Sequence, residues 1–381
     1  MFPPVARRAE SIASFLVMDI LEEALELEAR GEEIVHLEVG EPDFPTPQCI
    51  VNEARRALEA GRTRYTHSQG ALELRQAISD DYRGRCGVKV DPGSIIVTSG
   101  SSPALLLVLG ALIEPGDQVL LSDPGYACYP AFARFCGGES VFFPVRAGDA
   151  FVPQPDIIRA HMSARVKTII LNSPANPTGA VVPQEFLREI ASLDCSVISD
   201  EIYHGLTYRA PAHSILEFTD RCFVVNGFSK RYAMRGWRLG YAIAPPDFIR
   251  PMQKLQQNLF ISANTFVQAA AVAALGKAGA DAEKMRLTFD ERRKFIVPAL
   301  RELGFGVESY PEGAYYVLAE ASRFGDDSLA LARRILHGAK VALAPGIDFG
   351  RNAEGHLRFS YANSLENIKR AMEALANFLY P

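Results

Sequence analysis

The chain has 381 residues, of which 48% are hydrophobic and 22% are charged, and its formal net charge is −5. This composition excludes global disorder and allows a core large enough for about two or three domains. Charges of both signs are scattered along the chain without a polybasic run, which argues against nucleic acid or anionic lipid as a partner.

The first residues, Met1–Arg8, lack the apolar core of a secretory signal. The longest apolar run, Ala104–Ile113, is too short to span a bilayer. The six cysteines form neither a CxxC pair nor a metal-ligand spacing, so we expect neither a metal site nor a disulfide framework. The sequence therefore predicts a soluble cytoplasmic protein without a membrane partner.

The N-terminal part of the chain predicts one helix and one short strand. Apolar residues have helical spacing over Ser11–Arg30, and Gly31 is a suitable residue to end such a helix. The short strand Ile34–Leu37 follows, and then a turn-rich segment from Gly40 to Pro45.

Between residues 50 and 280, short apolar strands alternate with helical stretches. The predicted strands are Ser94–Thr98, Gln118–Leu121, Thr168–Leu171, Ser196–Ser199 and Phe223–Val225. They are apolar throughout rather than in alternation, which indicates burial on both faces and hence a mostly parallel sheet flanked by helices. We predict an α/β fold whose large domain spans residues 45–284.

The C-terminal part predicts a mixture of helices and strands. The predicted elements are a charged helix after about Lys284, strands at Gly306–Glu308, Tyr315–Leu318 and Val341–Leu343, and helices over Ser328–Gly338 and from Leu365. We assign residues 285–381, together with the N-terminal residues 1–44, to a smaller α+β domain.

Polar residues follow the predicted strands, at the sheet edge where ligands of such folds bind. These residues are Ser99, Gly100, Ser101, Ser102, Asn172, Asn176, Asp200, Tyr203, Ser229 and Lys230. The first four lead into a helix, whose free N–H groups suit a phosphate, although taken alone they are more often a simple N-cap. The chain has no GxxxxGK[ST] motif, which excludes a nucleotide P-loop.

Lys230 and Arg238 together suggest one cofactor. A lysine at a partly dry strand end loses its proton more easily and can attack an aldehyde. The planar guanidinium of Arg238 suits a phosphate. An aldehyde and a phosphate occur together in pyridoxal 5′-phosphate. The ordinary alternative is an exposed lysine and a solvated arginine.

Four other residues suit such a cofactor and its substrate. Asp200, at the end of a buried strand, needs a cationic partner such as a protonated pyridine nitrogen, and Tyr203 could donate to the ring oxygen. Tyr126 could stack on an aromatic ring, and Arg358 could bind an α-carboxylate. Taken singly, Asp200 is more readily an N-cap, Tyr126 a core tyrosine and Arg358 part of a structural ion pair.

The chain also carries a set of longer motifs. They are Gly40-Glu41-Pro42-Asp43-Phe44, Tyr65-Thr66 with Gly70 and Glu73-Leu74-Arg75, Asn172 through Gly179, Asp200-Glu201-Ile202-Tyr203, Ser229-Lys230 with Gly236-Trp237-Arg238-Leu239-Gly240, Ala344-Pro345-Gly346 and Arg358-Phe359-Ser360. In this order they resemble the class I/II aminotransferases, which are fold-type I pyridoxal-phosphate transferases, from about Val17 to the C-terminus. The resemblance implies that architecture, the cofactor pyridoxal 5′-phosphate and a homodimer.

The resemblance also implies roles for individual residues. Lys230 would be the Schiff-base lysine and general base, Asp200 would pair with the pyridine nitrogen, and Tyr203 would donate to the ring oxygen. The remaining roles fall to Gly100, Ser101, Ser102, Ser229 and Arg238 for the phosphate, Tyr126 for the ring face, Asn176 for the ring oxygen and the substrate, Arg358 and the Gly40 backbone for the substrate carboxylate, and Tyr65 for the phosphate of the neighbouring subunit.

The implied activity moves the amino group of an L-amino acid to a 2-oxo acid, with 2-oxoglutarate as the expected acceptor. Ser102 stands where relatives with acidic substrates often carry a basic residue, so a neutral or aromatic donor is at least as well supported as aspartate. Arg235 or a residue of the N-terminal helix could supply the missing charge. Phe15, Leu16 and Val17 are expected to line a lid.

Two other functions fit the same cofactor. A β-lyase that cleaves C–S bonds would use the same lysine and differ in its products. A catalytically silent regulator would need an N-terminal DNA-binding domain, and the residues before Gly40 leave no room for one.

Overall fold

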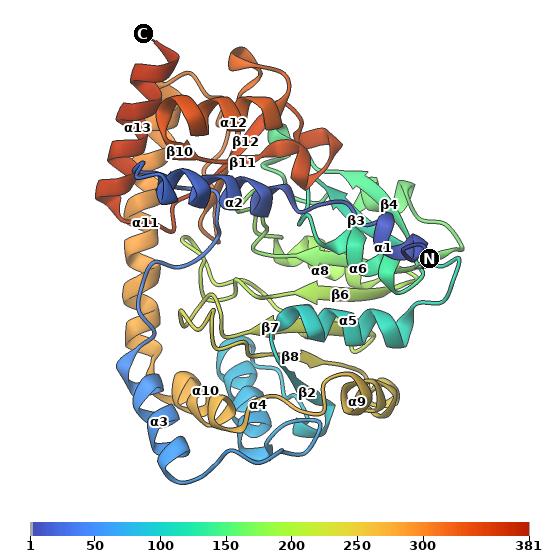
Figure 1. Cartoon of the computed structure of the whole chain (residues 1–381). Coiled ribbons are helices and arrows are strands. Elements are labelled where there is room, and N and C mark those ends of the chain that lie inside the picture. Colours follow the sequence, from blue (N-terminus) through green and yellow to red (C-terminus); the bar gives the residue numbers. More distant parts are fainter. Residues whose placement is uncertain (1–2, 381) are drawn as a thin grey trace.

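The structure is a computed structural model that describes residues 3–380 (Figure 1). Its strands are β1 (Val35–His36), β2 (Ile95–Thr98), β3 (Gln118–Asp123), β4 (Glu139–Pro144), β5 (Val166–Asn172), β6 (Ser196–Asp200), β7 (Cys222–Gly227), β8 (Gly240–Ile243), β9 (Tyr316–Glu320), β10 (Val341–Ala342), β11 (Ala344–Pro345) and β12 (His356–Ser360). Its helices are α1 (Arg7–Glu10), α2 (Leu16–Ala29), α3 (Gln48–Glu59), α4 (Leu72–Cys86), α5 (Ser101–Leu112), α6 (Tyr129–Phe135), α7 (Pro155–Ala160), α8 (Gln184–Ala191), α9 (Pro246–Leu259), α10 (Thr265–Lys277), α11 (Gly279–Glu302), α12 (Ser328–Ala339) and α13 (Leu365–Leu379).

The main sheet has seven strands in the order β2-β8-β7-β6-β5-β3-β4. Its strands pair in parallel except β8, which is antiparallel to both β2 and β7. The last residues of β5 and β6, Asn172 and Asp200, are paired in register. The carboxyl ends of the parallel strands therefore meet at one edge, which confirms the predicted mostly parallel sheet.

Helices cover both faces of the main sheet (Figure 1). On one face, α5 and α9 pack in a cluster that includes Leu105 and Met252. The other face packs against a larger cluster with Ile78 of α4. Ile169 and Ile170, which are adjacent in β5, belong to different clusters, because successive strand side chains point to opposite faces. This arrangement explains why the strands read as continuous apolar runs.

The C-terminal elements form two small sheets beside the main one. Strands β11, β12 and β9 pair antiparallel, and β1 of the N-terminal part pairs in parallel with β10. Helix α11 runs from the α10 region to these elements (Figure 1). The predicted domain boundary at residues 284 and 285 falls within this helix, so the division of the chain stays a prediction. None of the helices in residues 3–380 is long and apolar enough to cross a membrane.

Three local predictions were wrong. The N-terminal helix begins at Leu16, after the extended residue Phe15, and a separate turn of helix, α1, precedes it. Strands β4 and β8 were not predicted. The predicted strand Gly306–Glu308 is reduced to one bridge between Gly306 and Glu320, since a single facing residue pair does not extend into a ladder.

Candidate active site

A cavity of about 200 Å³ lies at the carboxyl edge of the main sheet. The predicted site residues that line it are Gly40, Ser101, Ser102, Tyr126, Asn176, Asp200, Tyr203, Lys230 and Arg358. Four others, Gly100, Ser229, Arg238 and Tyr65, lie outside its lining. The tertiary structure thus brings together residues that are up to 318 positions apart, from Gly40 to Arg358.

Lys230 follows β7 and reaches across the cavity. Its Nζ donates a hydrogen bond to the carbonyl oxygen of Gly40 at 2.8 Å and lies 5.8 Å from the ring centroid of Tyr203. Burial disfavours the ammonium form and lowers the pKa of Lys230 from 10.5 to about 8. A neutral amine, the form that attacks an aldehyde, is therefore far more accessible here than on an exposed lysine.

Asp200 ends β6 and is buried. Its carboxylate accepts hydrogen bonds from Tyr129 Oη at 2.7 Å and from the backbone N–H of Ile202 at 3.1 Å. Burial raises the pKa of Asp200 to about 6, although these two hydrogen bonds favour the charged form. Its bond to Ile202 resembles a local cap, yet the buried carboxylate would still gain from a cation such as a pyridinium.

Glu201, the residue after Asp200, also fixes the end of β6. Its side chain is fully buried and accepts hydrogen bonds from Tyr82 Oη at 2.9 Å and Ser214 Oγ at 2.7 Å. These partners belong to α4 and to the turn before residue 215. Asp200 is therefore attached to a strand end that is hydrogen-bonded on both sides.

Tyr129 was not assigned a role from the sequence. It begins α6, three residues after Tyr126, and the two rings pack edge to face at 5.2 Å between centroids. The signal in the sequence was the closeness of the two tyrosines, since Tyr126 lies in the turn that leads into α6 and Tyr129 is the first residue of that helix. Tyr129 thus connects Tyr126, the ring expected to stack on a cofactor, with the Asp200 carboxylate.

Arg358, in β12, is buried and donates two hydrogen bonds through its guanidinium. Its Nη1 donates to Asn176 Oδ1 at 2.9 Å, and its Nη2 donates to the carbonyl of Glu38. Its Nε has no hydrogen-bond partner among residues 3–380. The guanidinium stacks on Tyr316, at 4.5 Å from the ring centroid. Neither acceptor of the guanidinium is a carboxylate, so a bound carboxylate would stabilise this buried cation.

Tyr203 Oη shares a hydrogen bond of 2.8 Å with Tyr316 Oη. Tyr316 is a further residue without a role assigned from the sequence, and its hydroxyl lies so close to Gly40 that a side chain at position 40 would collide with it. Glycine at position 40 therefore allows Tyr316, Tyr203 and the Gly40 backbone to share one wall of the cavity.

The N-terminus of α5 forms the other end of the site. Gly100 is the N-cap residue with φ +113°, a conformation that favours glycine, and it has no side chain to satisfy the first N–H groups of the helix. Arg238 lies beside it, since a Cβ on Gly100 would be 2.7 Å from Arg238 Nη2. Ser229 is buried just before Lys230. Free N–H groups, a helix dipole and a guanidinium suit a phosphate.

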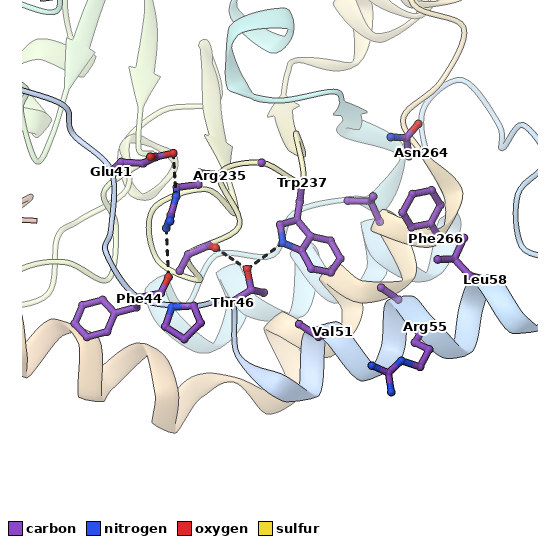
Figure 2. Close-up of a pocket in the computed structure, with 15 residues that line it drawn as sticks. Glu41, Phe44, Thr46, Val51, Arg55, Leu58, Arg235, Trp237, Asn264 and Phe266 are labelled. Carbon is purple, nitrogen blue, oxygen red and sulfur yellow. Dashed lines mark hydrogen bonds and ion pairs between the residues drawn. The ribbon is translucent and has the colours of Figure 1, made fainter. Parts of the chain in front are cut away.

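A second and larger hollow of about 760 Å³ lies elsewhere, lined by α3, α10 and residues 233–237 (Figure 2). Arg235 lines this hollow and not the cavity with Lys230, and its Nε pairs with Glu41 Oε1 at 2.9 Å. Arg235 therefore does not supply the missing charge near Ser102, as the sequence had allowed. The hollow has no lysine in its lining, so the aldehyde chemistry is not located there.

Tyr65 does not line the cavity of its own chain that contains Lys230, and 80% of its surface is exposed. The loop that carries it precedes α4. Within a single chain Tyr65 therefore has no part in the cavity, and its predicted role depends on a second subunit.

Comparison with known proteins identifies the family. The sequence profile of the family "Aminotransferase class I and II" matches residues 32–375. The chain belongs to the class I and II aminotransferases. These enzymes depend on pyridoxal 5′-phosphate, and the chain has their fold-type I architecture. The expected fold, cofactor and transamination activity are thereby confirmed.

Individual aminotransferases are similar over almost the whole chain. The (5-formylfuran-3-yl)methyl phosphate transaminase of Methanocaldococcus jannaschii is 42% identical, over 98% of this chain and 99% of that protein. The aspartate/prephenate aminotransferase of Thermus thermophilus is 37% identical, over 98% of both chains. The structure of Thermus thermophilus aspartate aminotransferase with maleate superposes with a TM-score of 0.95 at 37% identity, and covers 99% of this chain and 100% of that one.

Proposed function

We propose that this aminotransferase works through the cavity around Lys230, with Arg358 as the residue that binds the substrate α-carboxylate. The observation that carries the assignment is the buried guanidinium of Arg358, which lines the same cavity as Lys230 and whose two hydrogen-bond acceptors are not carboxylates. A carboxylate bound to this guanidinium would place the attached Cα inside the cavity that also contains the lysine.

The cofactor supplies an aldehyde for the substrate amino group and a ring that withdraws electron density from Cα. The phosphate would be held by the N–H groups of α5 with Ser101, Ser102 and Arg238. Asp200 would pair with the protonated pyridine nitrogen, and Tyr129 would hold the Asp200 carboxylate in position. The buried setting of Asp200 supports this pairing, since its hydrogen-bond donors in residues 3–380, Tyr129 Oη and the Ile202 N–H, are both uncharged.

Lys230 would act as the general base that removes the Cα proton and returns it to the cofactor carbon. Its lowered pKa supports this role, because a base that titrates near the working pH is partly neutral before the step. Tyr203 and Asn176 would donate to the ring oxygen. Phe15 and Val17 would exclude water from the cavity that they line.

We further propose an uncharged donor side chain. Among residues 3–380, the lysine and arginine side chains that line the cavity are Lys230 and Arg358, and both have roles already. The rest of the lining includes Phe15, Leu105 and Phe132. An apolar or aromatic side chain suits this wall better than a second carboxylate does. The expected acceptor, 2-oxoglutarate, carries such a second carboxylate, so it should be compared directly with pyruvate.

A single-turnover absorbance assay tests the function. The purified holoenzyme is mixed with one amino acid at a time, without an oxo acid, and the cofactor absorbance is followed. We expect conversion from the aldehyde to the amine form with at least one neutral donor, and reversal on addition of the acceptor. No conversion with any amino acid would contradict the proposal, and release of ammonia and pyruvate would identify a β-lyase.

Homodimerisation and a cytoplasmic location complete the proposal. The exposed Tyr65 supports a dimer in which this residue reaches the partner's phosphate. The six cysteines are all unpaired, which supports a reducing compartment.

A further inference from the structure

Helix α2 begins at the wall of the cavity without a cap from its own sequence. Its N-cap residue, Phe15, has no side chain able to accept from the first backbone N–H groups. The preceding hydroxyl, Ser14 Oγ, is engaged with Asp19 at 2.8 Å. A helix whose first N–H groups lack acceptors is less stable at that end, so another group has to satisfy them.

That group comes from the far end of the chain. The backbone N–H groups of Leu16 and Val17 donate to the two carboxylate oxygens of Asp348, at 3.0 Å and 3.1 Å. Asp348 is half-buried and lies 332 positions from Leu16. A carboxylate at a helix N-terminus is also favoured by the helix dipole. Asp348 therefore serves as a cap supplied from a distant segment.

The turn that carries Asp348, residues 346–349, is itself held firmly. A side chain on Gly346 would collide with the carbonyl of Ala353, and the carbonyl of Phe349 accepts from Gly125 N–H at 2.8 Å. The neighbouring strand β11 pairs with β12 so that Ala344 faces Arg358. The contacts of this turn therefore hold the Asp348 carboxylate in position.

The same turn touches the residue that we propose to bind the substrate carboxylate. The ring of Phe349, the residue after Asp348, lies 4.7 Å from the guanidinium carbon of Arg358. One short turn therefore contacts both Arg358 and the start of α2. Figure 1 shows α2 between the C-terminal elements and the main sheet.

The end of α2 that Asp348 holds presents apolar side chains to the cavity. Phe15, Val17 and Met18 belong to the lining, and the ring of Phe15 packs edge to face on Tyr126 at 6.3 Å between centroids. In its middle, α2 is held by an ion pair from Glu23 to Arg333 and by a hydrogen bond between Glu23 Oε1 and His337 Nε2, both partners being in α12. Only the cavity end depends on a side-chain cap.

We propose that Asp348 is a positioning residue for substrate specificity: it holds the cavity end of α2 so that Phe15 and Met18 form the wall against which the donor side chain packs. The inference rests on the proposed function, because it requires an amino acid in this cavity. A small donor side chain does not reach the wall, whereas a large apolar one gains contact area with it. Asp348 thus favours large apolar donors over small ones.

The test compares Asp348→Asn with the control Asp327→Ala. Asparagine keeps the size of the side chain but turns an NH₂ group toward one of the two N–H donors. Asp327 is also a helix cap in the C-terminal part, accepting from Ala330 N–H at 2.8 Å at the start of α12, and it is exposed and absent from the cavity lining. The control removes a helix cap elsewhere and keeps the two carboxylate oxygens that accept from Leu16 and Val17.

Two measurements are made on each holoenzyme. In the first, kcat/KM is measured for a large apolar donor, phenylalanine, and a small one, alanine. We expect the ratio to fall roughly fivefold to tenfold in Asp348→Asn, mainly through KM, as loss of one helix cap suggests, and to stay unchanged in Asp327→Ala. In the second, hydrogen exchange is measured for the amides of Leu16 and Val17, which should accelerate in Asp348→Asn alone.

Two results would overturn the inference. Unchanged hydrogen exchange at Leu16 and Val17 in Asp348→Asn would show that Asp348 does not stabilise the start of α2. Faster exchange with an unchanged ratio of kcat/KM for phenylalanine and alanine would show that this stabilisation does not determine donor specificity. If the wild type transfers no amino group from any donor, the proposed function and its specificity role both fail. The exchange measurement still decides whether Asp348 holds α2.

Discussion

At the scale of single residues, the environment and not the residue type gives this site its chemistry. Burial makes the Lys230 ammonium unfavourable and the Asp200 carboxylate unfavourable at the same time. The two groups reach the same cavity from the ends of adjacent strands, β7 and β6. A cofactor with an aldehyde and a basic ring nitrogen satisfies both.

The lowered pKa of Lys230 predicts how the apoenzyme captures its cofactor. Only the neutral amine attacks the aldehyde, and the neutral fraction rises with pH until the pKa is passed. We expect the rate of covalent capture to rise with pH and to level off above about 8, because the pKa is lowered to about 8 from 10.5. Stopped-flow absorbance of apoenzyme mixed with pyridoxal phosphate measures this rate.

The control for this measurement is Lys230→Ala, which should bind the cofactor without covalent capture. A rate that keeps rising toward pH 10.5, the ordinary lysine value, would contradict the lowered pKa.

At the scale of elements, strand ends and helix starts deliver the polar groups. Strand β6 ends in Asp200, β7 leads to Lys230, and α5 begins at Ser101 with the uncapped N-terminus behind Gly100. These are short local units, so the apolar runs and the residues that end them were readable in the sequence. The antiparallel β8 was missed because its four residues, Gly240–Ile243, give too short an apolar run to stand out from a turn.

The N-terminus of α5 can be tested through Gly100. Gly100→Ala would force a side chain onto a backbone with φ +113° and push it against Arg238 Nη2. Because such strain costs about 1–3 kcal/mol and displaces a phosphate-binding group, we expect cofactor affinity to fall at least about tenfold. A fluorescence titration of the apoenzyme with pyridoxal phosphate measures the Kd.

Gly110→Ala is the matched control within the same helix. A Cβ there would meet only Leu255 Cδ1 at 3.5 Å, an ordinary contact, and alanine favours a helix over glycine. The cofactor Kd should stay at the wild-type value. Equal affinities in both variants would contradict a phosphate site at Gly100.

At the scale of the whole molecule, the position of Tyr65 supports the proposal that each active site is completed by a second subunit. In one chain its ring is 80% exposed and outside the cavity. If Tyr65 completes the partner's site, mixing inactive Lys230→Ala subunits with impaired Tyr65→Ala subunits should restore activity. One site of each hybrid dimer would then contain both Lys230 and a Tyr65 from the other chain.

The hybrids are prepared by unfolding and refolding the mixture, and their mass is checked by analytical ultracentrifugation. The expected gain is a specific activity well above that of either variant refolded alone. A mixture with only the averaged activity of its components, despite a dimeric mass, would show that Tyr65 does not act across the interface.

The sequence by itself determined the fold class and the family, and it predicted residues that the fold then brings to one cavity. Lys230, Asp200 and Arg358 each stand in a short motif. Because such a motif consists of consecutive residues, it can be recognised before the position of its strand in the fold is known. The continuous apolar runs of the strands likewise predict burial on both faces, since such a run is a property of neighbouring residues alone.

Only the tertiary structure decided which side chains support that site. Tyr129 meets Asp200 across 71 positions, and Asp348 caps α2 across 332. Arg235, a candidate by its charge, pairs with Glu41 and lines the larger hollow instead of the cavity with Lys230. Such contacts depend on how whole elements pack and on the direction of each side chain. No local pattern of residues records that packing, so these partners appear only once the chain has folded.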